Sequence, residues 1–375
     1  MRSLALLLTL LAACSRHAPP PVVVQEIPLV DAPPLGPSDT RVRVTFVDVG
    51  QGDAILIETP CGAALIDAGG EDTPGFNGAR RLTRYLDAWF AARPHLDRTL
   101  ELVVLTHPHI DHIRGAPEVL SSFRVKRLID NGQPGRDVAE RPMRLIARAL
   151  ARDPGIARAS IALADIPPEG LTGDTVDPFL CDGLDPQLRV LWARVGADPG
   201  WGSSYGVPRF DNENNHSVVL RLDVGESSFL FTGDLEDAAL DDLVARYHGT
   251  GLLDVDVVKV GHHGSHNGTT KGLVDAMSPA MAVITMGAPQ RQASWSAWAF
   301  GHPRWKAVEL LLAGLGCPRP ATEGAVASRP RAFQPATVER ALYGTGWDGT
   351  VILEASAAGD VRVLAPPVDG VCDVR

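Results

Sequence analysis

Three histidines and an aspartate fall within the run His107-Pro108-His109-Ile110-Asp111-His112. The apolar run 102–106 before it predicts a buried strand, and Gly115-Ala116-Pro117-Glu118 after it predicts a helix start. On such a loop His107 and His109 can bind one metal ion, while Asp111 and His112 turn to a second ion about 3.5–4 Å away. Imidazole nitrogens and carboxylate oxygens suit Zn²⁺, and also Mn²⁺ or Fe²⁺. We therefore predict a centre for two divalent metal ions.

Further side chains of the same chemistry follow strand-like segments. Asp234 comes after an apolar run and Gly233, which places its carboxylate at a strand end, where it can bridge both metals. A strand predicted over 255–260 leads to His262 and His263. One of these two histidines is expected to complete the second metal site, and the other to contact the substrate or hold the nucleophile.

The H-x-H-x-D-H pattern resembles the metallo-β-lactamase superfamily, and other segments resemble its ComEC-like branch, named after a bacterial competence protein. These segments are 44–57, 64–70, Asn214 to Leu220, Phe231-Thr232-Gly233-Asp234, Lys259 to Ser265, and Gly301-His302-Pro303. The resemblance covers roughly residues 42–365. We expect only the hydrolase part to be shared, because the printed sequence has no membrane-spanning competence module.

The resemblance implies an α/β fold of the α+β type, a four-layer αββα sandwich. Two related units agree with it: one strand-turn-strand unit ends in Asp67 and another ends in Asp234. The expected hydrolase domain is 41–375, with an insertion at about 131–212 that contains a helix near 138–151 and shapes the substrate entrance.

Several roles rest on the resemblance alone. Asp67 is expected to support the ligand loops from behind, and Asp48, Asp53 and Ser265 to assist in the same way. Related phosphodiesterases favour His263 as ligand and His262 as substrate contact, with the reverse assignment left open.

The third ligand of the first metal is where the sequence departs from the wider superfamily. Many members have a histidine a few residues further upstream, whereas here the nearby histidine is His216. It is expected to be a ligand, a substrate contact or an exposed loop residue.

The sequence contains no P-loop, no dinucleotide fingerprint and no G-x-S-x-G nucleophile, so two metals are left to activate water. Asp111 or Asp234 would orient that water, and His262 or His302 would contact the phosphate or assist the leaving group. We predict a phosphodiesterase, with single-stranded or short nucleic acid as substrate because ComEC-like domains are associated with DNA processing. The alternatives are a hydrolase of a small phosphodiester such as a phosphocholine ester, and a non-catalytic binding lipoprotein.

The formal net charge of −10 disfavours binding of long duplex DNA by charge alone. Arginines nevertheless cluster at Arg80-Arg81 and within 124–127 and 141–152, and the last two clusters are typical of solvated helix faces.

The first residues predict export. Residues 1–13 resemble a signal peptide, and Leu11-Ala12-Ala13-Cys14 resembles a bacterial lipobox, in which Cys14 becomes a lipidated N-terminus. Residues 14–40 are rich in proline and predict a tether. We expect a lipid anchor to the outer membrane of a Gram-negative bacterium, facing the periplasm. An ordinary secretory signal and a cytosolic chain are the alternatives.

Four cysteines remain, Cys61, Cys181, Cys317 and Cys372, and allow two disulfides in three connectivities. We favour Cys317 with Cys372, with free thiols as the alternative.

Overall fold

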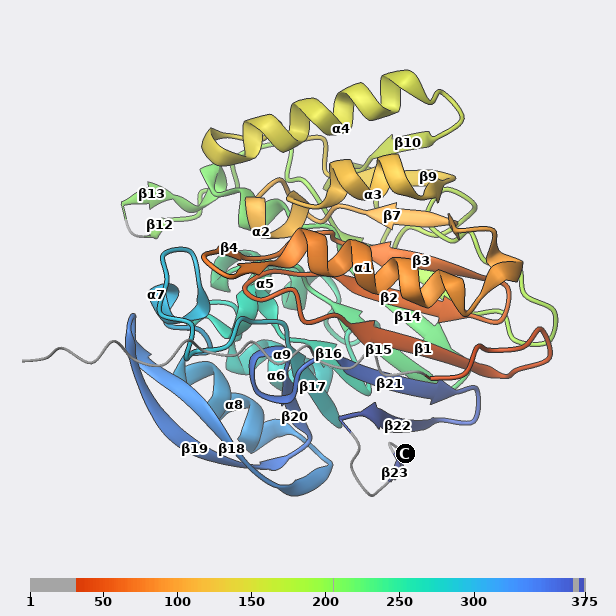
Figure 1. Cartoon of the computed structure of the whole chain (residues 1–375). Coiled ribbons are helices and arrows are strands. Elements are labelled where there is room, and N and C mark those ends of the chain that lie inside the picture. The colour runs from red at the N-terminus through yellow and green to blue at the C-terminus, as the bar shows by residue number, and fades with distance from the viewer. Residues whose placement is uncertain (1–31, 205, 367–370, 374–375) are drawn as a thin grey trace, which may run out of the picture.

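Two β-sheets packed face to face form the centre of the computed structural model, which describes residues 32–204, 206–366 and 371–373 (Figure 1). One sheet has nine strands in the order β10-β9-β7-β3-β2-β1-β21-β22-β23, and the other has six in the order β11-β14-β15-β16-β17-β20. The first sheet consists of β1 (Arg41–Phe46), β2 (Ile55–Thr59), β3 (Gly62–Ile66), β7 (Leu102–Val104), β9 (Arg127–Asp130), β10 (Ala157–Ser160), β21 (Val351–Ser356), β22 (Asp360–Ala365) and β23 (Val371–Asp373). The second consists of β11 (Gln187–Trp192), β14 (Val219–Val224), β15 (Ser227–Phe231), β16 (Val257–Lys259), β17 (Met281–Ile284) and β20 (Leu342–Gly344).

Shorter pairs and one long hairpin lie outside these sheets. They are β4 (Asp72–Thr73) with β5 (Phe76–Asn77), β6 (Thr99–Leu100) with β8 (Arg124–Val125), β12 (Ser203–Ser204) with β13 (Val207–Pro208), and the hairpin β18 (Pro318–Arg329) with β19 (Ala332–Arg340). The helices are α1 (Gly78–Ala91), α2 (Ile110–Ile113), α3 (Ala116–Ser122), α4 (Glu140–Arg152), α5 (Asp237–Arg246), α6 (Lys271–Met277), α7 (Ala297–Phe300), α8 (Trp305–Gly314) and α9 (Thr345–Asp348).

The alternation of side chains along the strands builds three apolar layers. Val44 and Phe46 of the first sheet meet Leu220 and Phe229 of the second in the central core. The opposite face of the first sheet packs against α1 and α3, and that of the second against α5, α6 and α8. The protein is therefore a four-layer αββα sandwich, as predicted.

The candidate functional residues follow the ends of strands in both sheets. The β2–β3 hairpin ends just before Asp67, and the β14–β15 hairpin ends just before Asp234. Since β3 runs parallel to β7, and β15 parallel to β16, the loops that follow these strands leave at the carboxyl ends of both sheets. The predicted helix of the insertion is α4, and the predicted strand before the histidine cluster is β7.

The end of the predicted tether packs onto the domain. Leu35 is buried, and the carbonyl oxygens of Ala32 and Pro33 accept hydrogen bonds from Arg93 and Arg43. The signal peptide and Cys14 lie outside the described residues. Within the described part, no helix is both long and apolar enough to cross a bilayer.

A disulfide joins Cys61 to Cys181, 120 residues apart. Cys317 is also disulfide-bonded. Its expected partner, Cys372, has a side chain that lies outside the described part of the chain.

Candidate metal centre and active-site cleft

The histidine cluster runs from the end of β7 into α2, as the sequence predicts. Asp67 fixes this loop from the neighbouring strand end. Its carboxylate accepts a hydrogen bond from the backbone N–H of Thr106 at 2.7 Å, and it lies 2.7 Å from Nδ1 of His112. With Nδ1 bonded to a carboxylate, His112 turns Nε2 toward the centre, which is the arrangement a metal-binding histidine needs.

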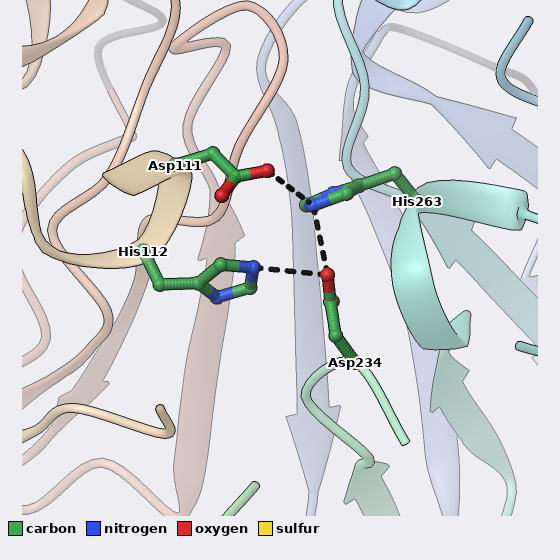
Figure 2. Close-up of side chains that lie close together, drawn as sticks. All are labelled: Asp111, His112, Asp234 and His263. Carbon is green, nitrogen blue, oxygen red and sulfur yellow. Dashed lines mark ion pairs between the residues drawn. The ribbon is translucent and has the colours of Figure 1, made fainter. Parts of the chain in front are cut away.

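Four side chains from three separate segments meet at one point (Figure 2). Oδ2 of Asp234 lies 3.2 Å from Nε2 of His112 and 3.2 Å from Nε2 of His263. Oδ2 of Asp111 lies 3.3 Å from the same nitrogen of His263. One ligand atom from each of the four lies within 4.8 Å of all the others, so a single cation can contact them together.

His107 and His109 lie beside this group. The ring centres of the two histidines are 4.7 Å apart, and the ring of His107 is 4.1 Å from that of His112. His107 is buried, whereas His109 is partly exposed, with Nε2 3.4 Å from Oε2 of Glu213. The two rings therefore extend the cluster toward solvent, and their nitrogens are the candidates to hold a second cation.

The donor set fits divalent metal ions. Nε2 of His107, His112 and His263 is buried and has no hydrogen-bond partner among the described residues. Burial acts to lower the pKa of His112 and His263, but nearby carboxylates outweigh it and hold both pKa values well above the usual range: those of Asp234 and Asp67 for His112, and those of Asp234 and Asp53 for His263. Surroundings that favour a proton on these rings so strongly also favour a metal cation between them.

Two glycines allow the loop with Asp111 to approach this closely. A Cβ on Gly69 would lie 1.5 Å from the carbonyl oxygen of Asp111, and one on Gly52 would lie 2.4 Å from it. That oxygen accepts hydrogen bonds from the backbone N–H groups of Asp53 and Gly70. Close packing of three loops thus explains why glycines occupy these positions.

Comparison with known proteins agrees with this architecture. Residues 47–193 match the family model described as the metallo-beta-lactamase superfamily. Within residues 47–193 the chain is therefore similar to the metallo-β-lactamase superfamily. Its resemblance to the competence proteins is confirmed as well: it is 28% identical over 282 residues to ComE operon protein 3 of Bacillus subtilis, covering 72% of this chain and 30% of that protein.

Recombination protein 2 of Haemophilus influenzae is 28% identical over 260 residues, an alignment that covers 69% of this chain and 25% of that protein. The chain therefore spans less than a third of the length of these two relatives. Among solved structures, the metallo-β-lactamase fold protein YhfI of Bacillus subtilis is 12% identical with a TM-score of 0.37, covering 66% of this chain and 86% of that chain.

An open cleft of about 560 Å³ borders the candidate metal centre. Asp111, Asp234 and His263 line it together with His262 and His302. Nδ1 of His302 lies 3.2 Å from Nε2 of Gln51, which can only donate, so the ring proton of His302 is on Nε2. Burial, aided by repulsion from the neighbouring histidines, keeps the pKa of His302 well below its usual value.

The histidine pair sits on a strained turn. His262 and His263 have φ values of 48° and 51°, in the left-handed region that such residues rarely adopt. The turn directs them differently: His263 faces Asp111 and Asp234, while Nε2 of His262 lies 4.0 Å from Asp234 and Nδ1 lies 3.7 Å from Glu236. This geometry favours His263 as ligand and His262 as substrate contact.

The structure places three predicted residues away from the metal centre. His216 accepts a hydrogen bond at Nδ1 from the N–H of Val195, and its Nε2 donates to the carbonyl of Phe210, so neither nitrogen is free for a metal. The expectation of His216 as a ligand is therefore wrong.

Asp48 pairs with Arg81 at 3.0 Å and accepts from the N–H of Gly50, so it shapes the glycine loop instead of holding a ligand. Ser265 donates to Asn267 within its own turn. Neither contacts a candidate ligand side chain.

The role of Lys259 was not predicted from the sequence. Its buried ammonium lies 2.5 Å from Oδ2 of Asp53 and 3.4 Å from Oδ1 of Asp234. Asp53 in turn lies 3.3 Å from Nδ1 of His263. The ammonium of Lys259 therefore pairs with two carboxylates, one next to a candidate ligand and the other a candidate ligand itself. A lysine at the end of an otherwise apolar strand was the available signal, since an unpaired charge does not persist there.

The roles of several polar side chains that follow the predicted insertion were also not predicted. Oδ1 of Asn214 and Oε2 of Glu236 are buried without a hydrogen-bond partner among the described residues, although Asn214 donates to the other oxygen of Glu236. Glu213 contacts both His109 and Arg136. These groups give the cleft a polar wall that the sequence pattern did not reveal.

Proposed function

We propose that this protein is a metal-dependent phosphodiesterase that acts on single-stranded or short nucleic acid. One observation carries the proposal: the buried Nε2 atoms of His112 and His263 converge with two carboxylates at the side of an open cleft, and neither nitrogen has a hydrogen-bond partner in the described part of the chain. A metal-dependent hydrolase needs histidine nitrogens that are available to bind metal ions, and it needs them beside a cleft that a substrate can enter.

Two divalent ions, Zn²⁺ first and Mn²⁺ second, are the proposed cofactors. His107 and His109 would hold one ion, Asp111, His112 and His263 the other, and Asp234 would contribute to both. When bound, such ions act as Lewis acids on a phosphoryl oxygen and make water a stronger nucleophile at neutral pH.

The surrounding side chains supply the rest of the chemistry. Because Gln51 donates to Nδ1 of His302, the Nε2–H of this neutral ring can donate to a phosphate oxygen in the cleft. His262, on the same wall, is a second neutral donor, because burial lowers its pKa. Donors placed before the reaction stabilise charge that develops on several oxygens, which a phosphodiester has and a lactone lacks.

A small phosphodiester is the second candidate substrate. The cleft volume of about 560 Å³ suits a small ligand, and the net charge of −10 does not favour a long polyanion.

A substrate panel tests the proposal. The chain is loaded with Zn²⁺ or Mn²⁺ and assayed with bis-p-nitrophenyl phosphate, a phosphorylcholine ester, single-stranded DNA, a lactone and a β-lactam. We expect phosphodiester turnover, and a loss of about 10²-fold or more in His302→Ala with unchanged metal content. His95→Ala, an exposed histidine on another surface, is the control. Lactone or β-lactam turnover without any phosphodiester turnover would refute the proposal.

We also propose that the protein is exported and anchored by lipid at Cys14. The disulfide between Cys61 and Cys181 supports an oxidising compartment. Full-length protein is expected in the membrane fraction, and Cys14→Ser is expected to release it or block its processing. A free mature N-terminus elsewhere in the chain would contradict the anchor.

A further inference from the structure

Helix α4 carries four exposed arginines, Arg141, Arg144, Arg148 and Arg152. Successive spacings of three, four and four residues place them on one face, while Ile146 is buried on another. We name these four residues the arginine stripe. Glu140, the acidic residue of α4, pairs with Arg144 at 3.1 Å, and the other three arginines keep the face positive. The stripe is about 16 Å long at 1.5 Å per residue.

The stripe begins at the rim of the active-site cleft. Arg136 and Val138, just before α4, line the cleft. Nε of Arg136 lies 3.2 Å from Oε1 of Glu213, whose other oxygen lies 3.4 Å from His109. In Figure 1, α4 is the outermost helix beyond α3, and the four arginines of the stripe are exposed on it.

Aromatic rings stand elsewhere on the wall of the same cleft. Trp295 and Phe300 line it with ring centres 6.0 Å apart, and they are 56% and 38% exposed. The Phe300 ring stacks on His302 at 5.8 Å with an interplanar angle of 25°. Exposed aromatic faces beside a predicted phosphate donor are suited to stacking of nucleic-acid bases.

We propose that these features together bind a single strand of nucleic acid: a base stacks on Trp295 and Phe300, and the phosphate backbone continues past Arg136 along the arginine stripe. The inference rests on the proposed phosphodiesterase function and assigns the residues that bind its proposed nucleic-acid substrate. A single strand has free base faces and a flexible backbone, whereas a duplex keeps its bases stacked and paired. A flat lipid surface could contact the stripe but could not enter the cleft to reach the two aromatic rings.

Binding of an oligonucleotide in EDTA tests the stripe without hydrolysis. Fluorescence anisotropy with a labelled oligothymidylate of about 12 nucleotides gives the affinity between about 50 and 200 mM salt. The double variant Arg148→Gln/Arg152→Gln removes two positive charges and keeps helix-forming residues at both positions. We expect it to bind more weakly. We also expect the slope of log K against log salt to be smaller in magnitude by about 1.4, which is about 0.7 for each lost phosphate contact. Arg340→Gln/Lys271→Gln removes the same charge from exposed sites on β19 and α6, and should keep the wild-type slope.

An abasic oligomer of the same length tests the stacking platform. Trp295→Ala should bind oligothymidylate roughly tenfold more weakly and the abasic oligomer unchanged, because only the former can stack. The arginine double variant should weaken both.

Each failure has a different meaning. Wild-type slope and affinity in the arginine double variant would overturn the inference, and so would an effect confined to binding of phosphatidylglycerol vesicles, which would assign the stripe to a membrane. Oligonucleotide binding as expected, with no turnover in the substrate panel, would sink the proposed function and leave the binding path intact. Turnover of bis-p-nitrophenyl phosphate with no oligonucleotide binding would overturn the binding path and leave the phosphodiesterase activity intact.

Discussion

Oδ2 of Asp67 lies 2.7 Å from Nδ1 of His112, and both side chains are fully buried. The hydrogen bond fixes which ring nitrogen faces Asp234, so a residue outside the ligand cluster determines the cluster's geometry. Asp67 has a φ of 58°, a backbone conformation that asparagine also tolerates.

Asp67→Asn should therefore weaken metal binding without unfolding the protein. The amide keeps the shape and tolerates the backbone, but loses the charge that orients His112. We expect metal affinity to fall about 10- to 100-fold, as is usual when such a supporting carboxylate is lost. Competition with a chromogenic chelator measures it. Unchanged affinity would mean that Asp67 serves the fold alone.

His107 and His216 should respond oppositely to replacement by alanine. The buried Nε2 of His107 has no hydrogen-bond partner in the described part of the chain, whereas both nitrogens of His216 bond to backbone groups. His107→Ala is expected to lower the metal content from about two per chain. His216→Ala should keep its metal and lose about 1–3 kcal/mol of unfolding free energy, since two buried backbone groups lose their partners. Elemental analysis and urea unfolding separate the two effects, and a loss of metal in His216→Ala would restore it as a ligand.

Local pattern was sufficient to predict much of this fold. The apolar run before His107 and the turn signals after it identified β7 and the loop into α2, and the two hairpins ending in Asp67 and Asp234 were evident as repeated units. Long-range contacts were not accessible in this way. The pairing of Lys259 with Asp53 depends on loops from two sheets, which no local periodicity encodes.

His216 illustrates the same limit for a single residue. Its type and its place before Ser217 fit a ligand, but the short helical turn Glu213–His216 directs the ring toward Val195 and Phe210. Side-chain direction within a loop depends on backbone geometry that a motif does not specify.

Asp177 should make stability depend on pH. Burial raises its pKa to about 6 from an ordinary value near 3.8, against backbone hydrogen bonds from Phe179 and Leu188 that lower it. Between these two pH values the folded chain binds more protons than the unfolded chain, so the contribution of Asp177 to stability falls as pH rises. Asp177→Asn removes this effect. Its melting temperature relative to wild type should increase from pH 4 to pH 7, in scans with metal content held constant; a constant difference would contradict the assignment.

Removing the charge of Lys259 should destabilise the protein strongly, because its ammonium pairs with two buried carboxylates. Its buried ammonium neutralises Asp53 and Asp234 and donates to the carbonyl of Gly233 at 2.9 Å. Lys259→Met keeps the apolar stem and removes the charge, which leaves two carboxylates close together in the interior. Breaking a buried pair in this way typically costs about 3–5 kcal/mol, because the remaining charge is uncompensated.

Urea unfolding in EDTA measures the loss in Lys259→Met, and Lys271→Met is its matched control. Lys271 pairs with Asp275 at 2.6 Å, one helical turn away on the exposed surface of α6, where water already solvates both charges. Such a pair contributes at most about 1 kcal/mol, so the control should unfold close to wild type. If the two variants were equally stable, the ammonium of Lys259 would not be what keeps Asp53 and Asp234 ionised beside the metal ligands.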